Sequence, residues 1–121
     1  MFDKFFPDRY VASTYVIDFE GLYKEGVRGL IFDIDNTLVP HGAPADERAR
    51  ALFKRLKSIG FRCCLISNNQ KPRVEMFNKD IQVDYVYNAH KPSIRNYLKA
   101  MEIMGTDRDS TVFIGDQLFT D

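Results

Sequence analysis

The chain has little cysteine, and what it has suits neither a disulfide scaffold nor a zinc site. Its two cysteines, Cys63 and Cys64, are adjacent in an apolar segment. Neighbouring residues of a strand point to opposite faces, so a disulfide between them would be strained, and neither has a spaced Cys or His partner for zinc. Two buried thiols are the better interpretation, and we expect a cytoplasmic protein.

The chain also lacks an excess of charge and a long hydrophobic run. Seventeen Lys and Arg side chains balance seventeen Asp and Glu side chains. No nucleic-acid partner is therefore expected, because no basic field is present. Charged residues interrupt the aromatic N-terminus and no apolar run reaches membrane-spanning length, so neither a secretory signal nor a transmembrane helix is predicted. Peripheral membrane contact through Phe2, Phe5 and Phe6 stays open as an alternative.

The sequence has the length and composition of one ordinary globular domain. The 121 residues are 45% hydrophobic, enough to bury one core with little room for a second. We expect a single domain over 1–121. It divides into an aromatic-rich, irregular lead at 1–26, which covers an edge or face, and a core at 27–121.

Apolar runs of strand length alternate with segments of helical periodicity. Strands are expected at 27–33, 61–67, about 85–87 and 111–115. Helices are expected at about 46–58, near 73–78 and at 93–104, the last with an inner side of Ile94, Tyr97, Leu98 and Met101. This alternation predicts an α/β fold with a parallel sheet whose strands all end on one rim.

The most informative segment runs from Gly29 to Val39. An apolar run ends in two carboxylates, Asp33 and Asp35, and a hydroxyl follows at Thr37. If the run is a buried strand, both carboxylates emerge at its carboxyl end, where open α/β sheets place their chemistry. Two crowded carboxylates repel and need a cation or a shared proton, so the segment predicts a metal-assisted acidic site.

Further polar residues converge on the same rim. They are Ser67, Asn68, Lys91, Asp116 and Asp121. Carboxylates, one lysine and two hydroxyls suit a doubly charged anion held by a hard cation, and Mg²⁺ prefers such oxygen ligands. A carboxylate in this setting can attack phosphorus, while a second one protonates the leaving alcohol and then activates water.

These segments resemble the four motifs of the haloacid dehalogenase (HAD) superfamily of phosphohydrolases, in family order. Residues 33–39 resemble motif I, 66–69 motif II, 90–92 motif III and 114–121 motif IV. A lone Asp-x-Asp-x-Thr is a moderate signal, whereas the ordered set is strong. The details of the motifs and the aromatic lead are most similar to the YqeG-like members of HAD subfamily IIIA.

The resemblance implies a role for each site residue. Asp33 would be the nucleophile and Asp35 the general acid and base, while Lys91 would neutralise developing charge. The substrate-binding residues would be Thr37, Ser67 and Asn68. The implied Mg²⁺ ligands are Asp33, the backbone carbonyl of Asp35, and Asp116, with Asp121 orienting the metal shell.

The resemblance also implies a three-layer Rossmann-like fold without a cap domain. Neither 38–45 nor 70–90 has room for a cap, so the site would be open. An open site suits a bulky substrate such as a lipid phosphate, and YqeG-like proteins resemble mitochondrial phosphatases of phosphatidylglycerophosphate. The alternatives are a nucleotide or sugar phosphatase with a lid from a partner subunit, or a non-catalytic module that binds metal and phosphate.

The chain stops at Asp121, where HAD domains ordinarily continue with a helix and a strand. We therefore expect a shortened domain with strand order 3-2-1-4 and the fifth strand missing. The strand at 111–115 would then be an exposed edge. An unpaired apolar edge invites pairing with another chain, so a homodimer through this strand is expected.

Overall fold

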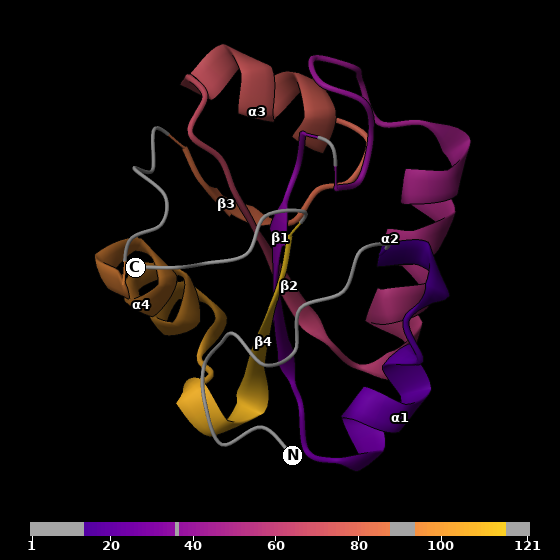
Figure 1. Cartoon of the computed structure of the whole chain (residues 1–121), viewed down its shortest axis with the longest axis vertical. Helices are drawn as coiled ribbons and strands as arrows, with labels where there is room; N and C mark the ends of the chain where they lie inside the picture. The colour runs from indigo at the N-terminus through magenta and orange to yellow at the C-terminus, as the bar shows by residue number, and fades with distance from the viewer. Residues whose placement is uncertain (1–13, 36, 88–93, 116–121) are drawn as a thin grey trace.

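The computed structural model describes residues 14–35, 37–87 and 94–115. Four parallel strands lie in the order β3-β2-β1-β4 (Figure 1). The strands are β1 Gly29–Asp33, β2 Arg62–Ile66, β3 Asp84–Val86 and β4 Thr111–Ile114. The helices are α1 Phe19–Lys24, α2 Glu47–Ile59, α3 Lys71–Asn78 and α4 Ile94–Met104, with 3-10 turns η1 Thr14–Val16 and η2 Arg108–Ser110. The expected α/β fold and strand order are confirmed.

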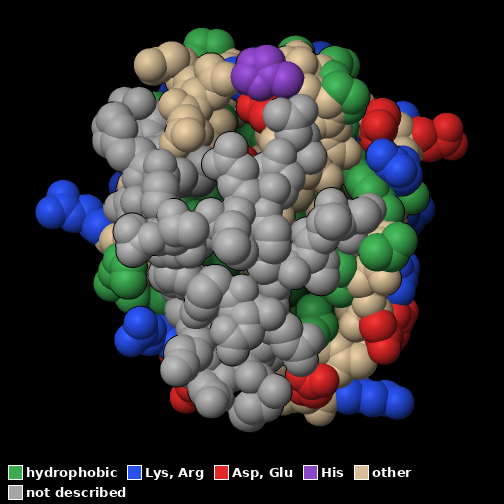
Figure 2. Space-filling model, viewed as in Figure 1, with side chains coloured by type: hydrophobic (Ala, Val, Ile, Leu, Met, Phe, Trp, Pro, Cys, Tyr) green, Lys and Arg blue, Asp and Glu red, His purple; other side chains and the backbone are tan. Residues whose placement is uncertain are grey.

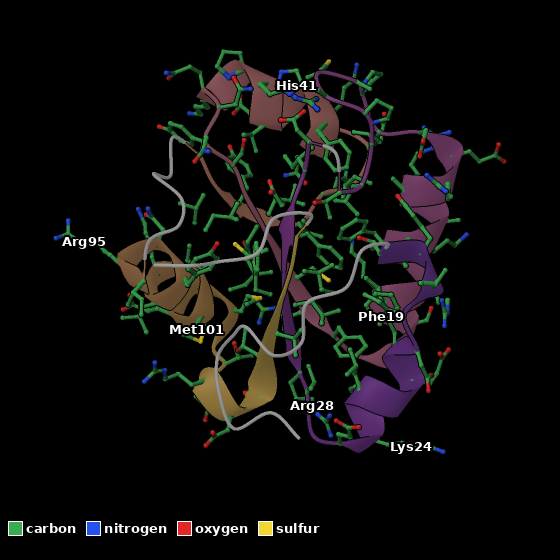
Figure 3. The ribbon with its side chains drawn as sticks, in the orientation of Figure 1. Phe19, Lys24, Arg28, His41, Arg95 and Met101 are labelled. Carbon is green, nitrogen blue, oxygen red and sulfur yellow. The ribbon has the colours of Figure 1, made fainter. Side chains whose placement is uncertain are left out.

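Helices cover both faces of the sheet and make three layers. In Figure 1, α4 lies on one side of the sheet, and α1 and α2 lie on the other. Alternate residues of the central strand explain this, because Leu30 and Phe32 pack with α1, α2 and α3, while Ile31 packs with α4. Arg95 and Lys24 point away from the sheet in Figure 3.

Helix α2 follows directly from its sequence pattern. The Asp46 carboxylate caps the helix by accepting a hydrogen bond from the Ala49 amide at 2.8 Å. Gly60, with φ of 120°, ends it in a conformation that favours glycine. The buried residues of α2 are Ala49, Leu52, Phe53 and Leu56. The predicted helix is confirmed.

Helix α4 is present, but its predicted inner face is partly wrong. Ile94 and Leu98 are 46% and 47% exposed. The buried residues of α4 are Tyr97, Ala100, Met101 and Met104. Tyr97 packs edge-to-face on Phe113 of β4, with ring centroids 4.9 Å apart, and this contact sets the rotation of the helix. Two apolar residues consequently face outward.

The lead at 1–26, expected to be irregular, contains η1 and α1 within its described part. The Asp18 carboxylate caps α1 by accepting a hydrogen bond from the Gly21 amide at 3.0 Å. Six residues with a glycine in the middle show no clear helical period, so the pattern missed this helix. Phe19 and Leu22 are buried in the core, as the expected covering role requires.

Strand β4 pairs with β1 and ends the sheet within the described residues. Its side chains are nevertheless buried, at 0–7% exposure. Within the described residues β4 therefore lies at the edge of the sheet, as expected, although packing against α4 and the core covers both faces of its side chains. Pairing of this strand with another chain stays a prediction.

None of the helices in the described segments is both long and apolar enough to cross a membrane.

Cys63 and Cys64 lie in β2 as buried free thiols on opposite faces of the sheet. Burial raises the pKa of both to about 12, so they stay protonated at neutral pH. We expect Ellman's reagent at pH 8 to label the native protein at least about 100-fold more slowly than the urea-unfolded protein. Rapid labelling of either cysteine in the native state would contradict this packing.

Candidate active site

A tight turn after β1 positions the two aspartates of motif I. Asp33 ends β1, in register with Ile66 of β2. The Ile34 carbonyl then accepts hydrogen bonds from three consecutive amides, those of residues 37, 38 and 39, at 3.0–3.4 Å. The chain therefore reverses immediately after Asp35, and both carboxylates stay at the carboxyl edge of the sheet, as predicted.

The 3-10 turn η1 stabilises this turn through two hydrogen bonds. The Tyr15 hydroxyl donates to the Leu38 carbonyl at 2.8 Å, and the Thr14 hydroxyl donates to the Thr37 carbonyl at 3.3 Å. Both bonds hold the backbone that carries Thr37. The lead thus supports the site, a role that its composition did not indicate.

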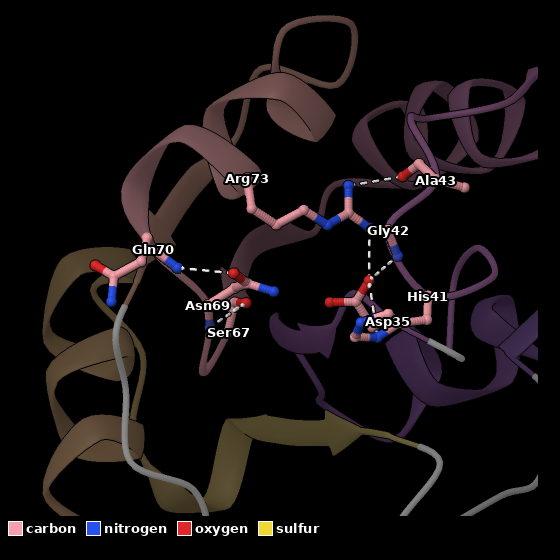
Figure 4. Close-up of polar contacts among 8 residues, drawn as sticks. All are labelled: Asp35, His41, Gly42, Ala43, Ser67, Asn69, Gln70 and Arg73. Atoms are coloured by element: carbon pink, nitrogen blue, oxygen red, sulfur yellow. Dashed lines mark hydrogen bonds and ion pairs between the residues drawn. The ribbon is translucent and has the colours of Figure 1, made fainter.

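The end of β2 supplies the motif II residues. Ser67 is 2% exposed, and its amide donates to the Val86 carbonyl at 3.0 Å. The Ser67 Oγ accepts a hydrogen bond from the Asn69 amide at 3.0 Å, which leaves the hydroxyl proton to donate elsewhere (Figure 4). Asn68 is exposed. Ser67 is therefore fixed at the rim where it was predicted.

Asp35 lies at the centre of a polar cluster that includes an unpredicted arginine. Its Oδ1 accepts hydrogen bonds from Arg73 Nη2 at 2.6 Å and from the Gly42 amide at 2.8 Å (Figure 4). The Nδ1 of His41 lies 3.9 Å from the same oxygen. Burial raises the pKa of Asp35, but these hydrogen bonds and the arginine charge outweigh it, so the pKa lies below its usual value.

Two buried polar atoms of the site have no hydrogen-bond partner among the described residues. They are the Thr37 Oγ1 and the Arg73 Nε. A buried polar atom left without a partner costs about 1–3 kcal/mol, so such atoms are rare in folded proteins. A ligand that accepts a hydrogen bond from the Thr37 hydroxyl would remove this cost. The orphaned hydroxyl therefore fits the predicted phosphoryl-binding role.

Gly115 brings the end of β4 next to Asp33. A Cβ built on this buried glycine would lie 3.6 Å from the Asp33 Cβ and only 2.6 Å from the Phe113 ring. The backbone of motif IV at Gly115 thus passes directly beside the predicted nucleophile. Lys91, Asp116 and Asp121 lie outside the described residues.

The oxygen donors that the described residues supply to the site suit a hard cation. They are the half-buried carboxylate of Asp33 and the backbone carbonyl of Asp35, both oxygen donors. Within the described residues no three His, Cys, Asp or Glu side chains form a metal cluster. Mg²⁺ keeps several waters and is commonly bound by one or two carboxylates with substrate phosphate, so this donor set is compatible with it.

Comparisons with known proteins point to one family. The model of the haloacid dehalogenase-like hydrolases matches residues 42–121. The probable phosphatase YqeG of Bacillus subtilis is 37% identical over 123 residues, a match that covers 100% of this chain and 72% of the relative.

Two solved structures share the fold at low sequence identity. A hypothetical protein from Xanthomonas campestris matches 89% of this chain with a TM-score of 0.65 and 20% identity. The cobalt-bound deoxy-D-mannose-octulosonate 8-phosphate phosphatase YrbI of Haemophilus influenzae matches 75% with a TM-score of 0.61 and 16% identity. This chain spans 66% and 59% of the lengths of those two proteins.

Proposed function

The chain belongs to the haloacid dehalogenase-like hydrolases and is a phosphatase related to YqeG, and we propose that it hydrolyses a phosphomonoester through an aspartyl-phosphate on Asp33. One observation carries the proposal. Asp33 and Asp35 leave β1 together, beside an orphaned Thr37 hydroxyl. A nucleophile, a proton-transfer group and a phosphate-binding donor thus come from five consecutive positions of the chain.

The proposed reaction has two displacements at phosphorus. In the enzyme form in which Asp35 is protonated, an Asp33 oxygen attacks, the bond from phosphorus to the ester oxygen breaks, and Asp35 gives its proton to the departing alcohol. Asp35 then takes a proton from water, which attacks the phosphorus and breaks its bond to Asp33. Inorganic phosphate leaves, and Asp33 returns as a carboxylate. Thr37, Ser67 and Lys91 would donate hydrogen bonds to the phosphoryl oxygens throughout.

The proposed cofactor is Mg²⁺. Asp33, the Asp35 carbonyl and Asp116 would hold it, with Asp121 orienting the shell. When bound, it would offset the repulsion between the Asp33 carboxylate and the phosphate anion.

An open site favours a bulky substrate, and we propose a lipid phosphate resembling phosphatidylglycerophosphate. Among the described residues, only a loop joins β1 to α2, and α3 is the one helix between β2 and β3. His41 beside Asp35 is 74% exposed, and in Figure 2 a histidine lies at the surface with acidic atoms next to it. A hollow of about 320 Å³, lined by residues 37–40 and Arg48, gives further room beside Thr37.

Metal removal tests the proposal. With excess Mg²⁺, we expect release of inorganic phosphate from phosphatidylglycerophosphate in mixed micelles to exceed release from nucleotide and sugar phosphates. EDTA should abolish release and added Mg²⁺ should restore it. Activity that survives EDTA would contradict the metal-assisted mechanism. Faster turnover of nucleotide or sugar phosphates would replace the lipid with the alternative substrates, and no turnover would favour a binding module.

A further inference from the structure

Arg73 connects helix α3 to the loop that follows motif I. Its Nη2 donates to Asp35 Oδ1 at 2.6 Å, and its Nη1 donates to the Ala43 carbonyl at 2.7 Å (Figure 4). The two side chains of the ion pair are 9% and 16% exposed. Both terminal nitrogens of the guanidinium are therefore engaged by the loop at 35–43, and the arginine has little freedom to move.

The contacts of Asp35 with described residues all fall on one oxygen. Oδ1 accepts from Arg73 and from the Gly42 amide, and His41 approaches the same atom. In Figure 4, the other oxygen of Asp35 is turned toward the side on which Ser67 and Asn69 lie. One oxygen is thus anchored and the other is presented to the rim of the sheet.

We propose that Arg73 is the positioning residue for proton transfer by Asp35. By fixing Oδ1, it holds Oδ2 in line with the ester oxygen of the substrate. This inference rests on the proposed function. Without Arg73, the Gly42 amide would be the remaining hydrogen-bond donor to Asp35 among the described residues, and the carboxylate could then rotate about its side-chain bonds. A loose proton donor loses most of its advantage, because proton transfer needs hydrogen-bond geometry at the moment of bond cleavage.

The dependence on the leaving group separates positioning of the acid from a structural role. We expect Arg73→Gln, in the full chain with Mg²⁺, to lower kcat/KM for an alkyl phosphate such as glycerol phosphate about 10² to 10⁴-fold, the range of general acid catalysis. The loss for p-nitrophenyl phosphate should be at least about 10-fold smaller, since its leaving anion is already stabilised and needs little protonation.

Arg55→Gln is the matched control. It removes an arginine from an ion pair with Glu20 on the exposed side of α2, where the two side chains are 47% and 54% exposed. This variant should act on both esters as the wild type does. Asp35→Asn should show the same leaving-group dependence as Arg73→Gln, and the double variant should lose little more than Asp35→Asn alone.

A second variant keeps the test decisive if Arg73→Gln fails to fold. Arg73→Lys retains a positive charge but cannot donate to Asp35 and Ala43 with a planar fork, so a smaller alkyl-ester deficit should persist. Added guanidinium should partly restore alkyl phosphate turnover by Arg73→Ala. Equal losses on both esters, or a change in KM alone, would overturn the inference. A wild type inactive on both esters and on phosphatidylglycerophosphate in mixed micelles would overturn the proposed function itself, and this inference with it.

Discussion

Replacing Asp33 with asparagine is expected to lower kcat by roughly 10⁴-fold or more, the scale of loss that follows removal of a catalytic nucleophile. The amide has nearly the same shape but is a poor nucleophile and a weak metal ligand. It fills the same half-buried position at the end of β1, so the fold should be retained. The measurement is phosphate release by Asp33→Asn under the conditions that give full wild-type turnover.

The stability of this variant is the control. Asp33→Asn should unfold in urea near the wild-type midpoint, because the amide has nearly the shape of the carboxylate that it replaces. A folded Asp33→Asn variant that retains more than about a tenth of wild-type activity would be incompatible with nucleophilic catalysis by this residue.

Replacing Phe53 with alanine should have the largest effect on stability. Phe53 of α2 is 1% exposed, and its ring packs against Phe32 with centroids 5.0 Å apart. Removing a buried phenyl ring leaves a cavity and costs about 3–5 kcal/mol. Since small domains have only about 5–15 kcal/mol of stability, urea should unfold Phe53→Ala at a far lower concentration than the wild type.

Two substitutions calibrate this result. Phe53→Leu keeps most of the buried volume and should lose markedly less stability. Lys54→Ala, at the exposed neighbouring position, should stay within about 0.5 kcal/mol of the wild type. If Phe53→Ala were as stable as Lys54→Ala, the packing of α2 on β1 would be wrong.

The sheet and its site-bearing edge could be predicted because their signals are local. The apolar run into Asp33 predicts a buried strand, and the run into Ser67 predicts its neighbour. The rotation of α4 could not be predicted, since the contact of Tyr97 with Phe113 outweighs the tendency to bury Ile94 and Leu98. A tertiary contact of this kind leaves no trace in the period of the helix.

Arg73 was missed for a similar reason. Its partner Asp35 is distant in sequence, and the contact depends on how α3 meets the motif I loop. Helix α3 begins at Lys71, earlier than predicted, with Pro72 in its first turn. A cation in the first turn opposes the helix dipole, so Arg73 at this place indicates a countercharge elsewhere in the fold. That signal was available in the sequence.

The central claim is that Asp33 carries the phosphoryl group during turnover. Acid quenching of the full-length protein mixed with Mg²⁺ and substrate, followed by mass spectrometry of its peptides, tests this most directly. With p-nitrophenyl phosphate, whose leaving group needs little protonation, we expect a phosphoryl group on Asp33 of the wild type, more of it in Asp35→Asn because hydrolysis of the intermediate is slowed, and none in Asp33→Asn. Continued turnover with no phosphoryl group on Asp33, or with one on another residue, would contradict the mechanism.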